Sequence, residues 1–107
     1  MKRLLASLVL FSLLAVPAFA DRIDGSWCAG ALKRVEITGP KISIAGKPAF
    51  EGNYTRHEFL YTVPVGEEHA GDQIYMRIHG EEDMTSYTIK NNEPVDPIDW
   101  KRCQGVS

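Results

Sequence analysis

Apolar and polar residues alternate along most of the chain after residue 20, in short segments separated by Gly, Pro, Asn and Asp. A period of two is typical of β-strands that bury one face, and no segment of useful length has the period of an amphipathic helix. Turn residues occur at 39–40, 46–48 and 66–71, and residues 91–97 form one longer connection. We expect strands at residues 25–28, 32–38, 41–44, 49–54, 56–63, 73–79, 84–90 and 98–103.

The same alternation assigns a core face and a solvent face to these strands. The predicted core face consists of Val35, Ile37, Ile42, Ile44, Phe59, Tyr61, Val63, Ile74, Met76 and Ile78. Their neighbours are mostly polar: Glu36, Glu58, Leu60, Thr62, Tyr75, Arg77 and His79. The predicted fold is therefore all-β, a small antiparallel β-barrel or curled sheet of about seven or eight short strands, because curling covers exposed edges and encloses the apolar side chains.

The first twenty residues have the pattern of a Sec-type signal peptide. Lys2 and Arg3 precede an apolar run at residues 4–16, and Ala18-Phe19-Ala20 is a small-x-small cleavage site. The run is shorter than the roughly 20 residues of a membrane span, and Asp21 stands where a lipoprotein needs cysteine. We expect cleavage after Ala20, a single small β-domain at residues 21–107, and a periplasmic or secreted location with no stable membrane insertion.

Two cysteines, Cys28 and Cys103, lie near the two ends of the predicted domain. Thiols pair in an oxidising compartment, and a domain this small usually needs a covalent constraint. We expect a disulfide between them that joins the N- and C-terminal strands and contributes roughly 4 kcal/mol.

Charge argues against one class of partner. The sequence contains 12 Lys and Arg against 14 Asp and Glu, a formal net charge of −2, and cleavage would remove two of the cations. Nucleic acids are bound by clustered cations, whereas the cations here are scattered among acids. Nucleic acid is excluded as a partner, and the oligomeric state remains open.

Aromatic residues supply the candidate binding site. Trp27 and Trp100 flank the two cysteines and either fill the core or line a ligand cleft. The richest segment is residues 54–61, where Arg56, His57 and Tyr61 are further candidates. Alternation places His57 on the side of Phe59 and Tyr61 as a half-buried imidazole, either structural or binding.

No pattern indicates a metal or another cofactor. His57, His69 and His79 are the only histidines, and their spacing matches no metal motif; residues 57–61 have Tyr61 where the His-Glu-x-x-His motif requires histidine. No nucleophile has an evident base, so we expect no catalytic residue.

Four segments carry a family resemblance: residues 23–28, 37–40, 52–61 and 100–103. Together they resemble a group of short, uncharacterised exported proteins of α-proteobacteria, which implies a periplasmic location and an intact domain but no activity. Gly25-Ser26-Trp27 is also similar to the Gly-x-Trp opening of lipocalin- and avidin-type barrels.

These observations favour a non-catalytic binding or envelope-accessory protein, whose partner is an unknown small ligand or envelope protein. The alternative is a secreted inhibitor of an envelope or host hydrolase, which would use the 66–71 loop. An enzyme that pairs His57 with Glu58 or Asp99 ranks last, because alternation points Glu58 away from His57.

Overall fold

The computed structural model describes residues 22–104, which contain nine β-strands and no helix. The proposed signal peptide lies outside the described residues, and no helix within them is long and apolar enough to cross a membrane. The strands are β1 (Gly25–Ala29), β2 (Lys33–Thr38), β3 (Lys41–Ile44), β4 (Phe50–Glu51), β5 (Asn53–Tyr54), β6 (Glu58–Thr62), β7 (Gln73–Ile78), β8 (Asp83–Lys90) and β9 (Glu93–Arg102).

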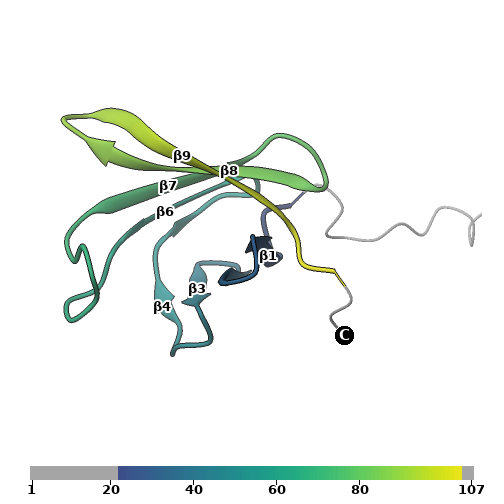
Figure 1. Cartoon of the computed structure of the whole chain (residues 1–107), viewed down its shortest axis with the longest axis horizontal. Helices are drawn as coiled ribbons and strands as arrows, with labels where there is room; N and C mark the ends of the chain where they lie inside the picture. Colours follow the sequence, from purple (N-terminus) through teal and green to yellow (C-terminus); the bar gives the residue numbers. More distant parts are fainter. Residues whose placement is uncertain (1–21, 105–107) are drawn as a thin grey trace, which may run out of the picture.

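All nine strands belong to one antiparallel sheet of order β4-β3-β2-β1-β9-β8-β7-β6-β5. The ladder is open, because no pairing joins β4 to β5. These two edge strands are nevertheless consecutive in the chain and separated by Gly52 alone. The sheet therefore curls, and its two edges approach each other. Figure 1 shows the sheet bending from β9 and β8, past β6, round to β4 and β3.

Gly52 has a steric reason to be glycine. A Cβ atom at this position would lie 2.5 Å from the Phe59 ring and 2.7 Å from the carbonyl oxygen of Leu60. The strand predicted at residues 49–54 is thus divided: β4 pairs with β3, and β5 pairs with β6.

The longer connection predicted at residues 91–97 is wrong, because β9 begins at Glu93. Asn91 and Asn92 have φ angles of 53° and 65°, which allow a two-residue hairpin turn. β1 pairs with β9 only at Arg102 and Lys101, so the first part of β9 has no neighbouring strand on that side. An edge of this kind needs no amide donor, and β9 therefore accommodates Pro94 and Pro97.

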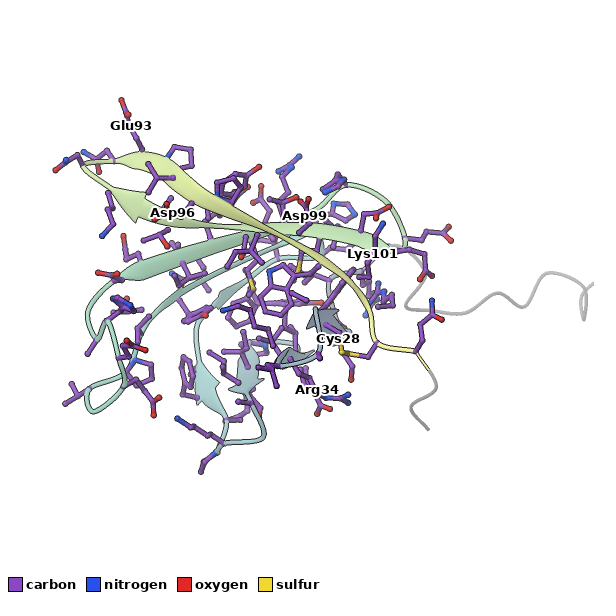
Figure 2. All side chains as sticks on the ribbon, viewed as in Figure 1. Cys28, Arg34, Glu93, Asp96, Asp99 and Lys101 are labelled. Atoms are coloured by element: carbon purple, nitrogen blue, oxygen red, sulfur yellow. A yellow bond between two sulfur atoms is a disulfide. The ribbon has the colours of Figure 1, made fainter. Side chains whose placement is uncertain are left out.

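The predicted core face is confirmed. Seven of its ten residues are buried, and Ile44, Val63 and Ile74 are partly buried against that core. The complete buried apolar set is Ile23, Trp27, Val35, Ile37, Ile42, Phe59, Tyr61, Met76, Ile78, Met84 and Trp100. Side chains from opposite parts of the sheet meet inside the curl (Figure 2).

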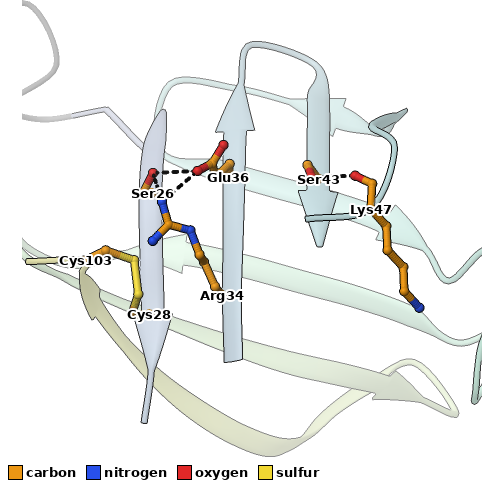
Figure 3. A network of polar contacts seen from close by, with 7 residues as sticks. All are labelled: Ser26, Cys28, Arg34, Glu36, Ser43, Lys47 and Cys103. Atoms are coloured by element: carbon orange, nitrogen blue, oxygen red, sulfur yellow. Dashed lines mark hydrogen bonds and ion pairs between the residues drawn. A yellow bond between two sulfur atoms is a disulfide. The ribbon is translucent and has the colours of Figure 1, made fainter. Parts of the chain in front are cut away.

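The disulfide is confirmed as well. Cys28 in β1 bonds to Cys103, which directly follows β9, across a Cα–Cα distance of 5.0 Å and 75 positions of sequence. The Cys103 amide also donates to the Ser26 carbonyl at 3.1 Å, so β1 and the C-terminal segment lie side by side (Figure 3). The bridge therefore links the N- and C-terminal strand regions in the middle of the sheet.

Candidate functional site

Antiparallel pairing gives the curled sheet two ends. Turns 39–40, 55–57 and 79–82 lie at one, which we call the packed end. Turns 30–32, 45–49 and 63–72 lie at the other, the open end. The two ends differ in how side chains fill them.

Trp27 belongs to the packed end and is fully buried. Its Nε1 donates to the Ile23 carbonyl at 2.8 Å, and the Arg102 guanidinium lies 4.0 Å from its ring centroid. Asp24 accepts a 2.5 Å bond from the Tyr54 hydroxyl, which raises the pKa of Tyr54. With its ring packed and its polar atom bonded, Trp27 fills the core at the packed end.

The open end is hollow. A cavity of about 240 Å³ extends between the start of β2 and the strands β6 to β9. Its wall includes Tyr61, Ile74, Met76, Ile98 and Trp100. The Trp100 indole donates to the Ser86 hydroxyl at 2.9 Å, so the polar atom of this large side chain is satisfied within the wall. The wall is therefore mainly apolar.

A second, larger groove of about 500 Å³ adjoins the first, since Lys33, Ile44 and Tyr61 line both. It extends under the β3–β4 and β6–β7 turns, where Phe50, Val63 and two prolines form its apolar lining: Pro48 and Pro64. We call the two neighbouring spaces together the open-end pocket.

Tyr61 lies at the centre of the open-end pocket. Its ring meets Phe50 edge-on at 5.5 Å and Phe59 at 6.3 Å between centroids. Burial raises the pKa of Tyr61 to about 12, so its hydroxyl is neutral at physiological pH. The hydroxyl brings polarity to the pocket without charge.

Charged groups form the rim. Lys47 and Glu67 make a 2.7 Å ion pair between the β3–β4 and β6–β7 turns. Arg34 binds Glu36 at 2.8 Å on the outer face of β2, and this contact lowers the pKa of Glu36 (Figure 3). Lys33 also belongs to the rim, and it contacts both spaces.

Arg56 and His57 do not join Tyr61 and Trp100. The half-buried position predicted for His57 is wrong: both residues are exposed in a bend before β6. Thr55 explains the bend, because its amide donates to the Glu58 carbonyl and its Oγ1 accepts from the Glu58 amide. The strand starts two residues later than expected, and His57 borders only a separate, shallow hollow at the packed end.

The acids considered for a catalytic dyad have other partners. Glu58 accepts from the Tyr75 hydroxyl at 2.6 Å and pairs with Arg77. Asp99 accepts from Thr85 at 3.2 Å, and Thr85 contacts His79 rather than His57. Residues 22–104 contain no group of three or more His, Cys, Asp or Glu placed to hold a metal.

Sequence reasoning found Tyr61 and Trp100 but missed most of the wall. Ile44, Val63 and Ile74 were assigned to the core, and the alternation does place them inside the curl. The alternation does not show how far apart the opposing strands lie at their ends. That separation decides whether an inward-facing residue fills the core or lines a pocket.

Comparisons of the chain with protein-family models, curated proteins and solved structures give no match. The site must therefore be interpreted from its own geometry.

Proposed function

We propose that this protein is a non-catalytic, exported binding protein that holds an apolar small molecule in the open-end pocket. The observation that carries the proposal is the pair of neighbouring spaces, about 240 and 500 Å³, whose exposed lining is mainly apolar, with charged residues such as Lys33 and Lys47 at the rim. Small-molecule sites are typically concave, apolar and a few hundred Å³ in volume, with few polar groups.

Half-buried apolar residues supply the driving force. Ile44, Phe50, Val63, Ile74 and Ile98 pack against the core on one side and remain partly accessible on the other. Covering such surface stabilises a complex by roughly 25 cal/mol per Å². The packed end and the disulfide hold the wall in place, so little ordering is required when a ligand binds.

The predicted export agrees with this role. A disulfide persists in an oxidising compartment, which supports a periplasmic or secreted location after signal-peptide cleavage. We further propose that the curled sheet, with its edges joined through Gly52, acts as a small barrel closed around the ligand at one end.

The test is a fluorescence titration with N-phenyl-1-naphthylamine, a neutral apolar probe, using the mature domain. We expect saturable binding, weakened at least about tenfold by Ile74→Trp, because the larger side chain occupies the cavity. Thr62→Trp is the matched control, since it adds the same side chain to the exposed outer face of the adjacent strand.

A second readout does not depend on whether Ile74→Trp folds. Binding of the probe should change the emission of Trp100 in the unmodified protein, and the change should disappear in Trp100→Phe, where only the buried Trp27 remains. Absence of saturable binding, or binding unaffected by Ile74→Trp, would refute the proposed function.

A second candidate, inhibition of a hydrolase, is favoured by the β6–β7 loop. Val65 is 97% exposed at its tip. The Val63 amide donates to the Asp72 carbonyl and the Gly71 amide to the Val63 carbonyl, so the base of the loop is fixed. An inhibitor would lose potency against an envelope or host protease on Val65→Asp, whereas probe binding would remain.

A further inference from the structure

Lys33 differs from the other cations at the rim of the open-end pocket. Arg34 is ion-paired with Glu36, and Lys47 with Glu67. Within residues 22–104, the ammonium of Lys33 has no hydrogen bond or ion pair, and Lys33 is an exposed residue that lines both spaces. A cation without a counter-charge at the junction of an apolar pocket can pair with an anionic group on a bound molecule.

Building on the proposed function, we propose that the ligand is an amphiphile with an anionic headgroup, and that Lys33 selects the headgroup. The apolar part would lie against Ile74, Ile98 and Trp100, which line the inner cavity, while the anion remains at the exposed junction near Lys33. A carboxylate or phosphate there keeps most of its hydration, which avoids the large cost of burying a charge.

Acidic groups around the pocket limit where the anion can lie. Glu67 is neutralised by Lys47, and His69 lies 3.9 Å from Glu68. Asp96 lines the inner cavity from the β9 bulge, where its φ is 54°, and it has no bonded partner in the described part of the chain. Asp96 disfavours an anion deep in the cavity, which leaves the headgroup at Lys33.

The experiment compares ligands of equal chain length and different headgroups. Decanoate, decyl phosphate and decanol would each displace N-phenyl-1-naphthylamine from the mature domain at low ionic strength. We expect both anions to bind more tightly than decanol and the advantage to shrink with added salt. Comparing decanoate with decyl phosphate shows whether the site prefers a carboxylate or a phosphate headgroup.

Variants then assign the preference to one side chain. Lys33→Ala should weaken both anions about two- to fivefold, the range of an exposed ion pair, and leave decanol unchanged. Lys33→Arg should retain the preference, and Asp96→Asn should strengthen binding of the anions by removing repulsion. Lys41→Ala is the matched control, because Lys41 is also exposed but pairs with Glu51 near the packed end.

Failure of this inference can be distinguished from failure of the proposed function. Equal binding of decanol and the anions, or anion binding unchanged by Lys33→Ala, would overturn the role of Lys33 while probe binding still supports an apolar site. If neither the probe nor any decyl compound binds, the proposed function is refuted, and the role of Lys33 is refuted with it.

Discussion

Removing the Arg102 side chain should destabilise the protein more than any other truncation of a charged residue described here. Its three guanidinium nitrogens donate to backbone carbonyls of Asp24, Arg22 and Glu81 at 2.6, 2.7 and 2.9 Å. The guanidinium plane also covers the Trp27 ring. One side chain from the last strand thus holds the segment before β1 and the β7–β8 turn at the packed end.

The magnitude follows from these contacts. Hydrogen bonds from a charged donor contribute about 1.5–3 kcal/mol each, and a cation–π contact about 0.5–1 kcal/mol when exposed. Two effects reduce the sum: desolvation opposes the charge and lowers the pKa of Arg102, and water can rehydrate the released carbonyls. We expect Arg102→Ala to cost about 2–4 kcal/mol, and Arg102→Lys about 1–3 kcal/mol, because an ammonium cannot reproduce the planar fork.

Urea unfolding of the disulfide-bonded domain measures the effect. At this domain size 1 kcal/mol corresponds to about 4–8 °C in melting temperature, so thermal unfolding supplies an independent check. Arg77→Ala is the control, because Arg77 is an exposed cation whose ion pair with Glu58 is screened by water and should contribute little. If Arg102→Ala and Arg77→Ala differ by less than about 0.5 kcal/mol, the packed end does not depend on this clamp and our account of it is wrong.

Three further predictions concern the bridge, the core and the pocket. Cys28→Ser and Cys103→Ser should each cost about 2–5 kcal/mol in unfolding free energy, with the double variant no worse than either; additive losses would contradict a single bond. Phe59→Ala should cost about 3–5 kcal/mol by urea unfolding, since the ring is fully buried, and a cost below 1 kcal/mol would contradict the face assignment. The folded pKa of Tyr61, about 12, lies above the unfolded value near 10, so its contribution is complete below about pH 10 and is lost as pH rises towards 12. Tyr61→Phe should flatten that alkaline decline in stability, and an identical decline in both proteins would refute the assignment.

Much of this fold was predictable because a period of two is a strong local signal. Val35, Phe59 and Met76 face the core as their spacing requires, and the pairing of Phe59 with Met76 keeps both on one face. The disulfide was predictable for a different reason: a chain with two cysteines has only one intramolecular pairing. The first inference needs only the order of residues within a short segment, and the second needs only the number of cysteines.

Two interruptions of the strand pattern were not predictable from the alternation of apolar and polar residues. His57 was placed on a strand because the apolar pattern continues beyond it, whereas the bond between Thr55 and Glu58 starts the strand later. Gly52 interrupts a segment that looks like one strand, and the reason is the Phe59 ring that packs against it. Alternation alone reports neither the bonds between Thr55 and Glu58 nor the close approach of Gly52 to Phe59.

The prolines of β9 link the unpredicted part of the fold to the candidate site. Pro94 and Pro97 are typical of a connection, but a strand edge without a neighbour tolerates a missing amide donor equally well. β1 ends at Ala29 and leaves the first part of β9 without a partner on that side, and the bulge near Asp96 lies in this stretch. Asp96 and Ile98, both in this stretch of β9, line the inner cavity. The stretch of β9 that carries the prolines therefore also contributes Asp96 and Ile98 to the pocket wall, and β1 does not pair with it.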